Sequence, residues 1–165
     1  YKMKGAKIMK SINRRSVINF LLVFGAMLTI LMIGSVELRQ AFADQEKVKV
    51  LYHVDGKDLD TAKYAMALIN KHIEAEGGPD KIDVVLVVHG PALPLFEADT
   101  VDPVLKKKLK MVLDKGAQAE MCQVSQKLFG TPLEKLVAGF KHTAHPVAVK
   151  RIADLQKEGY IYIKP

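Results

Sequence analysis

The segment from Asp83 to Val88 constrains the fold more than any other part of the sequence. It reads Asp-Val-Val-Leu-Val-Val, so aliphatic side chains follow one another without polar alternation. A strand of this kind is buried on both faces, which is typical of a parallel sheet covered by helices. The turn residues His89-Gly90-Pro91 end it. The segment therefore predicts a strand inside a parallel sheet.

Strand-like and helical segments alternate on either side of this run. We predict the other strands over residues 48–54, 117–121, 140–143 and 160–163. Apolar spacings of three and four predict helices over residues 58–76, 102–116, 123–129 and 146–158. Asp58 and Asp102 stand at the starts of the first two helices, where their side chains are suited to cap them. Residues 92–101, with mixed polarity and a proline, are expected to form a loop.

The capping-box spacing of Thr131 and Glu134, with Pro132 between them, predicts one more short helix. Strand and helix thus alternate five times along the chain. This order predicts an α/β fold with an open, mainly parallel five-stranded sheet and helices on both faces. We expect one such domain over residues 44–165, preceded by an N-terminal hydrophobic helix.

Residues 1–43 have the features of a signal peptide. Basic residues precede an almost wholly apolar run over 17–36, and Ala41-Phe42-Ala43 matches a small-x-small cleavage site. The pair Arg14-Arg15 leaves both Sec and twin-arginine export open. About 20 apolar residues also suffice to span a bilayer, so an uncleaved membrane anchor is the alternative. Both interpretations place the following domain outside the cytoplasm, either periplasmic or anchored to the membrane.

The distribution of charge argues against a nucleic-acid partner. The formal net charge is +7, but the first 43 residues hold seven Lys and Arg against one Glu, which leaves only +1 for residues 44–165. A nucleic-acid-binding domain carries a basic footprint that is absent here. The lysine run at residues 106–108 lies in a predicted helix and is typical of a solvated face.

The candidate site residues lie where the predicted strands end. Open α/β sheets bind ligands beyond the carboxyl ends of their strands. His53 lies near the end of the first strand, His89 follows the second, Cys122 ends the third, and His142 and His145 follow the fourth. Histidines in these places can orient a thiol or bind a metal, and they also occur simply as hydrogen-bonded polar groups.

Cys122 is the only cysteine, so it cannot form an intramolecular disulfide. In an exported protein an unpaired cysteine suggests a reactive thiol or an intermolecular bond. Its predicted place, between a strand end and a helix, directs backbone N–H groups at the sulfur and so favours the thiolate. The alternative is a buried, inert cysteine.

Known nucleotide-binding and hydrolase motifs are missing from the sequence. There is no GxGxxG, P-loop or GxSxG motif, and Gly77-Gly78-Pro79 precedes a strand, as a turn does. The pair His142 and His145 is only a weak metal signature. We therefore predict no cofactor and assign no metal ligand.

Four segments in a fixed order carry a family resemblance: the strand 48–54, the run 84–91, the strand that ends at Cys122, and the C-terminal residues 159–165. Together they resemble the DsrE-like (DsrE/DsrF-like) sulfur-relay family, in an exported form. The resemblance implies a flavodoxin-like parallel domain that forms homotrimers or homohexamers. It also implies that Cys122 carries sulfur as a persulfide, received from or passed to a partner protein.

In this interpretation His89 and His53 tune the thiol, and the three residues form a catalytic group. The alternative function is a non-catalytic oligomeric module that binds a small ligand or a metal with its rim histidines. The reactivity of Cys122 separates the two hypotheses.

Overall fold

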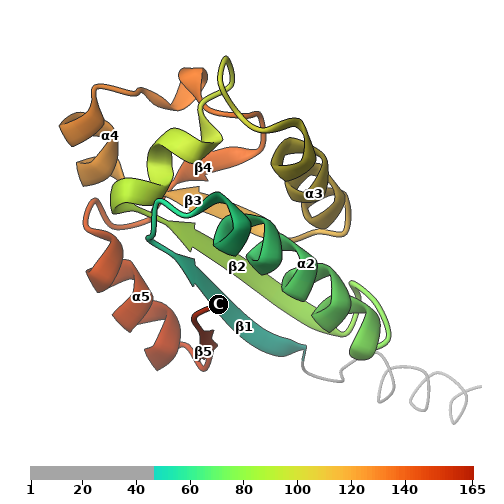
Figure 1. Ribbon diagram of the computed structural model, residues 1–165. Coiled ribbons are helices and arrows are strands. Elements are labelled where there is room, and N and C mark those ends of the chain that lie inside the picture. Colours follow the sequence, from blue (N-terminus) through green and yellow to red (C-terminus); the bar gives the residue numbers. More distant parts are fainter. Residues whose placement is uncertain (1–46) are drawn as a thin grey trace, which may run out of the picture. The chain divides into compact units, whose positions relative to one another are not determined.

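The computed structural model describes residues 47–165, in which strands alternate with helices (Figure 1). The elements in chain order are β1 (Val48–Val54), α2 (Leu59–Ala75), β2 (Ile82–Val88), the 3-10 helix η1 (Gly90–Phe96), α3 (Pro103–Asp114), β3 (Gln118–Met121), α4 (Gln123–Phe129), the 3-10 helix η2 (Leu133–Lys135), β4 (Phe140–His142), α5 (Ala148–Lys157) and β5 (Ile161–Ile163). The predicted leader, its cleavage site and the hydrophobic helix lie outside the described residues. No helix within residues 47–165 combines the length and the apolar character needed to cross a membrane.

The five strands form one sheet in the order β4-β3-β2-β1-β5. Every neighbouring pair is parallel, and β1 and β2 pair along their whole length, from Val48 opposite Ile82 to Val54 opposite Val88. After β4, helix α5 returns the chain to the opposite edge, where β5 lies beside β1. All five carboxyl ends therefore lie at one edge of the sheet, and the predicted open parallel fold is confirmed.

Both faces of the central strands are buried, as the sequence of β2 predicts. The larger cluster covers the face under α2 and α3, and it includes Val50, Val84, Leu86, Met66, Ile69, Leu105 and Leu109. The smaller cluster packs α5 on the other face, and it includes Leu51, Val85, Val87, Cys122, Ala148, Ile152 and Leu155. Figure 1 shows α2 and α5 on opposite sides of the sheet.

The predicted helix caps are confirmed. The Asp58 carboxylate accepts a hydrogen bond of 2.7 Å from the Thr61 N–H at the start of α2. At the start of α3, Asp102 accepts from the N–H groups of Val104 and Leu105 at 2.9 and 3.0 Å. Each cap stabilises its helix, since it satisfies N–H groups that have no partner within the helix.

The predicted loop over residues 92–101 is wrong in its first half. Residues 90–96 form η1, and its apolar side chains Ala92, Leu93 and Phe96 are fully buried. Pro91 occupies the first turn of η1. Proline has no backbone N–H, but an N–H in the first turn of a helix has no partner within the helix. Burial of the three apolar side chains stabilises this helical turn. The mixed polarity of the segment does not predict it.

The short helix predicted from Thr131 and Glu134 forms only as the single 3-10 turn η2, and its predicted capping by Thr131 is wrong. The Thr131 hydroxyl does not cap a helix. It donates instead to the carboxylate of Glu97, 34 residues earlier, at 2.6 Å. The Thr131 hydroxyl, on which the capping-box pattern depends, is therefore used in a tertiary hydrogen bond.

Candidate functional site

His53, His89 and Cys122 lie at the carboxyl edge of three adjacent strands. His53 belongs to β1, and His89 follows β2, with its N–H bonded to the carbonyl of Val54 at 3.2 Å. Cys122 follows β3, and its N–H donates to the carbonyl of Val88 at 3.0 Å. The strand ladder therefore continues through these residues and fixes their backbones, as expected from the sequence.

Cys122 is the N-cap residue of α4, between the last residue of β3 and the helix. Its side chain is buried, with 4% of its surface exposed, and packs in the cluster beneath α5. The Sγ donates to the carbonyl oxygen of Pro146 at 3.4 Å. The thiol thus lies where the chain that enters α5 passes over the end of β3.

Two opposing effects set the acidity of this thiol. Burial, the largest single effect, raises the pKa of Cys122. Hydrogen bonds from the Ser125 hydroxyl and from the N–H groups of Ser125, Ala148 and Val124 outweigh it, so the pKa lies below its ordinary value. The neutral thiol makes no capping hydrogen bond to α4. These donors therefore act on the thiolate, which is the form they stabilise.

His53 and His89 form a close pair. Their Nε2 atoms lie 2.7 Å apart, and the rings are stacked with centroids 4.8 Å apart. The Nδ1 of His53 is hydrogen-bonded to the Tyr162 hydroxyl of β5 at 2.7 Å. Burial lowers the pKa of both histidines, and the charge of His89 contributes to the value of about 4 for His53. Both rings are therefore neutral at pH 7.

Asp55 and Lys164 border the histidine pair. A carboxylate oxygen of Asp55 lies 3.7 Å from the His53 Nε2, and the Lys164 ammonium donates to the same oxygen at 2.8 Å. The hydrogen bond from Lys164 lowers the pKa of Asp55, which keeps it ionised. Two imidazoles and a carboxylate thus meet at the end of β1, and these donors are of the kind that hold a metal ion.

The structure brings the two predicted histidines together but separates them from the thiol. Within residues 47–165, Cys122 shares no recorded hydrogen bond with either imidazole. The connection is indirect, since the Gly90 N–H, next to His89, donates to the Ser125 hydroxyl oxygen at 2.7 Å. The role of His53 and His89 in tuning the thiol stays a prediction.

His142 and His145 do not join this group. His142 bonds through Nδ1 to the side-chain oxygen of Gln126 at 2.8 Å, and His145 accepts at Nδ1 from the N–H of Val147 at 3.1 Å. In the described part of the chain, the metal-compatible cluster contains neither of them.

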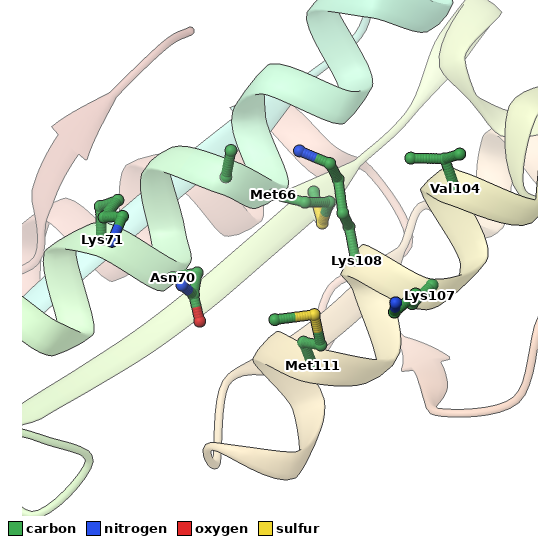
Figure 2. A pocket seen from close by; sticks show the side chains of 8 residues that line it. Met66, Asn70, Lys71, Val104, Lys107, Lys108 and Met111 are labelled. Atoms are coloured by element: carbon green, nitrogen blue, oxygen red, sulfur yellow. The ribbon is translucent and has the colours of Figure 1, made fainter.

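Two hollows beside α3 lie away from His53, His89 and Cys122, whereas a third, of about 430 Å³ beside α5, is lined by His145. One of about 380 Å³ lies between α2 and α3 (Figure 2), lined among others by Met66, Asn70 and Lys71 of α2 and by Val104, Lys107, Lys108 and Met111 of α3. A second, of about 890 Å³, borders α3 and the chain before β4. Neither contains a histidine or the cysteine, so we place the candidate site at the strand edge from its chemistry.

Four groups of the site escape sequence reasoning: Asp55, Ser125, Tyr162 and Lys164. Tyr162 and Lys164 reach β1 from 109 residues away. The only sequence signal for Tyr162 and Lys164 is their position at the end of the last predicted strand. Ser125 lies three residues after Cys122, in the first turn of the predicted helix. The helix prediction therefore already places Ser125 close to the thiol.

The five strands form a parallel sheet, and the cysteine that follows the third strand favours the thiolate form. The protein is therefore a small α/β protein with a thiol at the carboxyl edge of its sheet. The sequence model of the DsrE/DsrF-like family matches residues 46–165. The chain belongs to this family, and membership of it suggests sulfur relay at the level of the family. A search of curated proteins gives no match.

Two solved structures share the fold. MTH1491 from Methanobacterium thermoautotrophicum, a protein of unknown function, superposes with a TM-score of 0.63 at 16% identity and covers 72% of this chain and 100% of its own. The ychN protein from E. coli gives a TM-score of 0.57 at 10% identity, over 71% of this chain and 99% of its own. At these identities the likeness concerns the fold alone.

Proposed function

We propose that this protein is a thiol-based sulfur carrier in which Cys122 holds sulfane sulfur as a persulfide. One observation carries the proposal: the only thiol of the chain begins a helix at the carboxyl edge of the sheet, and its neighbours stabilise the thiolate. Membership of a family associated with sulfur relay supports the same chemistry. Cys122 is then the catalytic residue, and His53 and His89 stay candidates for its tuning.

The transfer needs only a sulfane-sulfur donor. The Cys122 thiolate attacks the outer sulfur of a persulfide or of thiosulfate, a new S–S bond forms, and the donor leaves as a thiolate or as sulfite. An acceptor thiolate then attacks the terminal sulfur of the Cys122 persulfide and releases the Cys122 thiolate. No net oxidant is required, because each step exchanges one bond to sulfur for another.

Mass spectrometry of the intact protein tests this proposal. Incubation with thiosulfate or polysulfide should add about 32 Da per sulfur atom, and a reductant should remove it. Because the chain has a single cysteine, Cys122→Ser is a complete control and should gain nothing. A Cys122 that never gains sulfur would refute the carrier and favour the alternative, a non-catalytic module that binds a ligand or a metal.

We further propose that the protein forms a homo-oligomer, a trimer or hexamer. The support lies on α4, where Leu128 is 76% exposed beside Val124 and Phe129, so that a short helix presents an apolar surface to solvent. Light scattering should give the mass of three or six chains, and Leu128→Glu should lower it. A monomer at micromolar concentration would contradict this proposal.

We propose that the domain acts after export, in the periplasm or tethered to the membrane. The support is the sequence of residues 17–43, with its apolar run and Ala-x-Ala site. N-terminal sequencing of protein from fractionated cells should begin at Asp44 if the leader is cleaved. A full-length chain in the membrane fraction would indicate an anchor, and a full-length chain in the cytoplasm would contradict export.

A further inference from the structure

Three potential metal ligands converge beside the candidate sulfur site. They are one ring nitrogen each of His53 and His89 and a carboxylate oxygen of Asp55, and all lie within 4.8 Å of one another. The two nitrogens are 2.7 Å apart, and the Asp55 oxygen is 3.7 Å from His53. Ligand atoms around a tetrahedral Zn²⁺ stand about 3.3 Å apart for bonds of about 2.0–2.1 Å. Small side-chain rotations therefore suffice to surround an ion.

The surroundings of His53 resemble those of a metal ligand. Its Nδ1 is bound to the Tyr162 hydroxyl at 2.7 Å, which fixes the ring and directs Nε2 toward His89. In metal sites a bond of this kind at the second nitrogen orients the ligating one. An imidazole binds a metal through a ring nitrogen that has lost its proton, and the contact between the two Nε2 atoms places both of these nitrogens toward one point.

Two neutral imidazoles that face each other through Nε2 share a single proton between them, so one donates and the other accepts. A metal ion would replace that proton and bind both nitrogens at once. The carboxylate of Asp55 adds the negative charge that a divalent ion requires.

We propose that His53, Asp55 and His89 form a binding site for a divalent transition-metal ion of the Zn²⁺ type, with at least one coordination position open. Two imidazoles and one carboxylate are the ligand set of many catalytic zinc sites. His89 and Asp55 are partly exposed, so an ion has access from solvent. Cys122 is not among the ligands, so metal binding and sulfur loading can be measured separately.

Lys164 limits the affinity of this site. Its ammonium holds the same Asp55 oxygen at 2.8 Å and repels a cation. Removal of the ammonium frees the carboxylate, so Lys164→Gln should bind the metal several-fold more tightly. A purely structural hydrogen-bond cluster gives no reason for such a gain.

The test uses the full-length protein, stripped with a chelator and titrated with Co²⁺. We expect visible absorption of four- or five-coordinate Co²⁺ at about one ion per chain, bleached by Zn²⁺, and a Zn²⁺ dissociation constant from competition with a coloured chelator. His89→Ala and Asp55→Asn should each weaken binding at least tenfold. His142→Ala, a histidine outside the site, and Cys122→Ser should leave affinity unchanged.

Circular dichroism of each variant shows whether it has folded, and only folded variants are compared. Asp55→Asn keeps the shape of the side chain, so it stays informative if His89→Ala does not fold. The proposal fails if the wild-type protein gives no Co²⁺ band, if His142→Ala weakens binding as much as His89→Ala, or if Cys122→Ser abolishes it. The last result would leave the sulfur-carrier proposal intact, since that is tested by sulfur loading.

Discussion

The hydroxyl oxygen of Ser125 accepts a hydrogen bond of 2.7 Å from the backbone N–H of Gly90. This bond joins the end of β2 to α4. Because the oxygen is already used as an acceptor, the hydroxyl proton is free to point at the Cys122 sulfur, where it helps to lower the pKa of the thiol. Ser125 thus connects the backbone beside His89 to the Cys122 thiol.

Ser125→Ala should raise the pKa of Cys122. The variant removes a hydrogen bond to the thiolate and leaves the burial that disfavours it. We expect alkylation by iodoacetamide at pH 7 to slow about three- to tenfold, as for the loss of a hydrogen bond worth about 1 kcal/mol. Gln123→Ala, on the same helix, is the matched control. Equal alkylation rates in wild type and Ser125→Ala would contradict this role.

The pH dependence of alkylation should follow the lowered pKa of Cys122. The thiolate is present above that pKa and is lost as pH falls through it. The rate should therefore reach half its maximum below the pH at which an ordinary thiol does so, about 8.5. Glutathione in the same buffers provides the reference, and a midpoint at or above that of glutathione would show that burial prevails.

Arg151 of α5 holds the buried carboxylate of Glu120 of β3 through two hydrogen bonds of 3.0 Å. Glu120 is 1% exposed, so Arg151→Leu leaves a buried charge whose one remaining ion-pair partner within residues 47–165 is Lys141, 3.8 Å away. We expect urea denaturation to show a loss of about 3 kcal/mol. The double variant Glu120→Leu, Arg151→Leu should recover much of that loss. No recovery would mean that packing of Arg151, rather than charge, stabilises α5.

The fold follows from the sequence wherever local patterns and burial agree. The unbroken apolar run of β2 predicts a doubly covered parallel strand, and Asp58 and Asp102 predict the starts of two helices; the structure confirms each. The pattern fails at η1 and at Thr131. In both places contacts from distant parts of the chain decide the conformation, through burial of Phe96 and through the bond from Thr131 to Glu97.

The site is predictable only in part, for the same reason. The rule that ligands bind beyond strand ends selects His53, His89 and Cys122, which lie at that edge. It also selects His142 and His145, which do not join the histidine pair. Pairing of the histidines depends on the adjacency of β1 and β2. Their contact with Tyr162 depends on β5 joining the far edge of the sheet, and no local spacing encodes that strand order.

Reaction with cyanide measures most directly whether Cys122 carries sulfur that can be passed on. Protein loaded with polysulfide and freed of excess reagent should release about one equivalent of thiocyanate per chain in the cold, because cyanide attacks the outer sulfur of a persulfide. The Cys122→Ser protein should release none. Equal release from both proteins, or none from the wild type, would contradict the account.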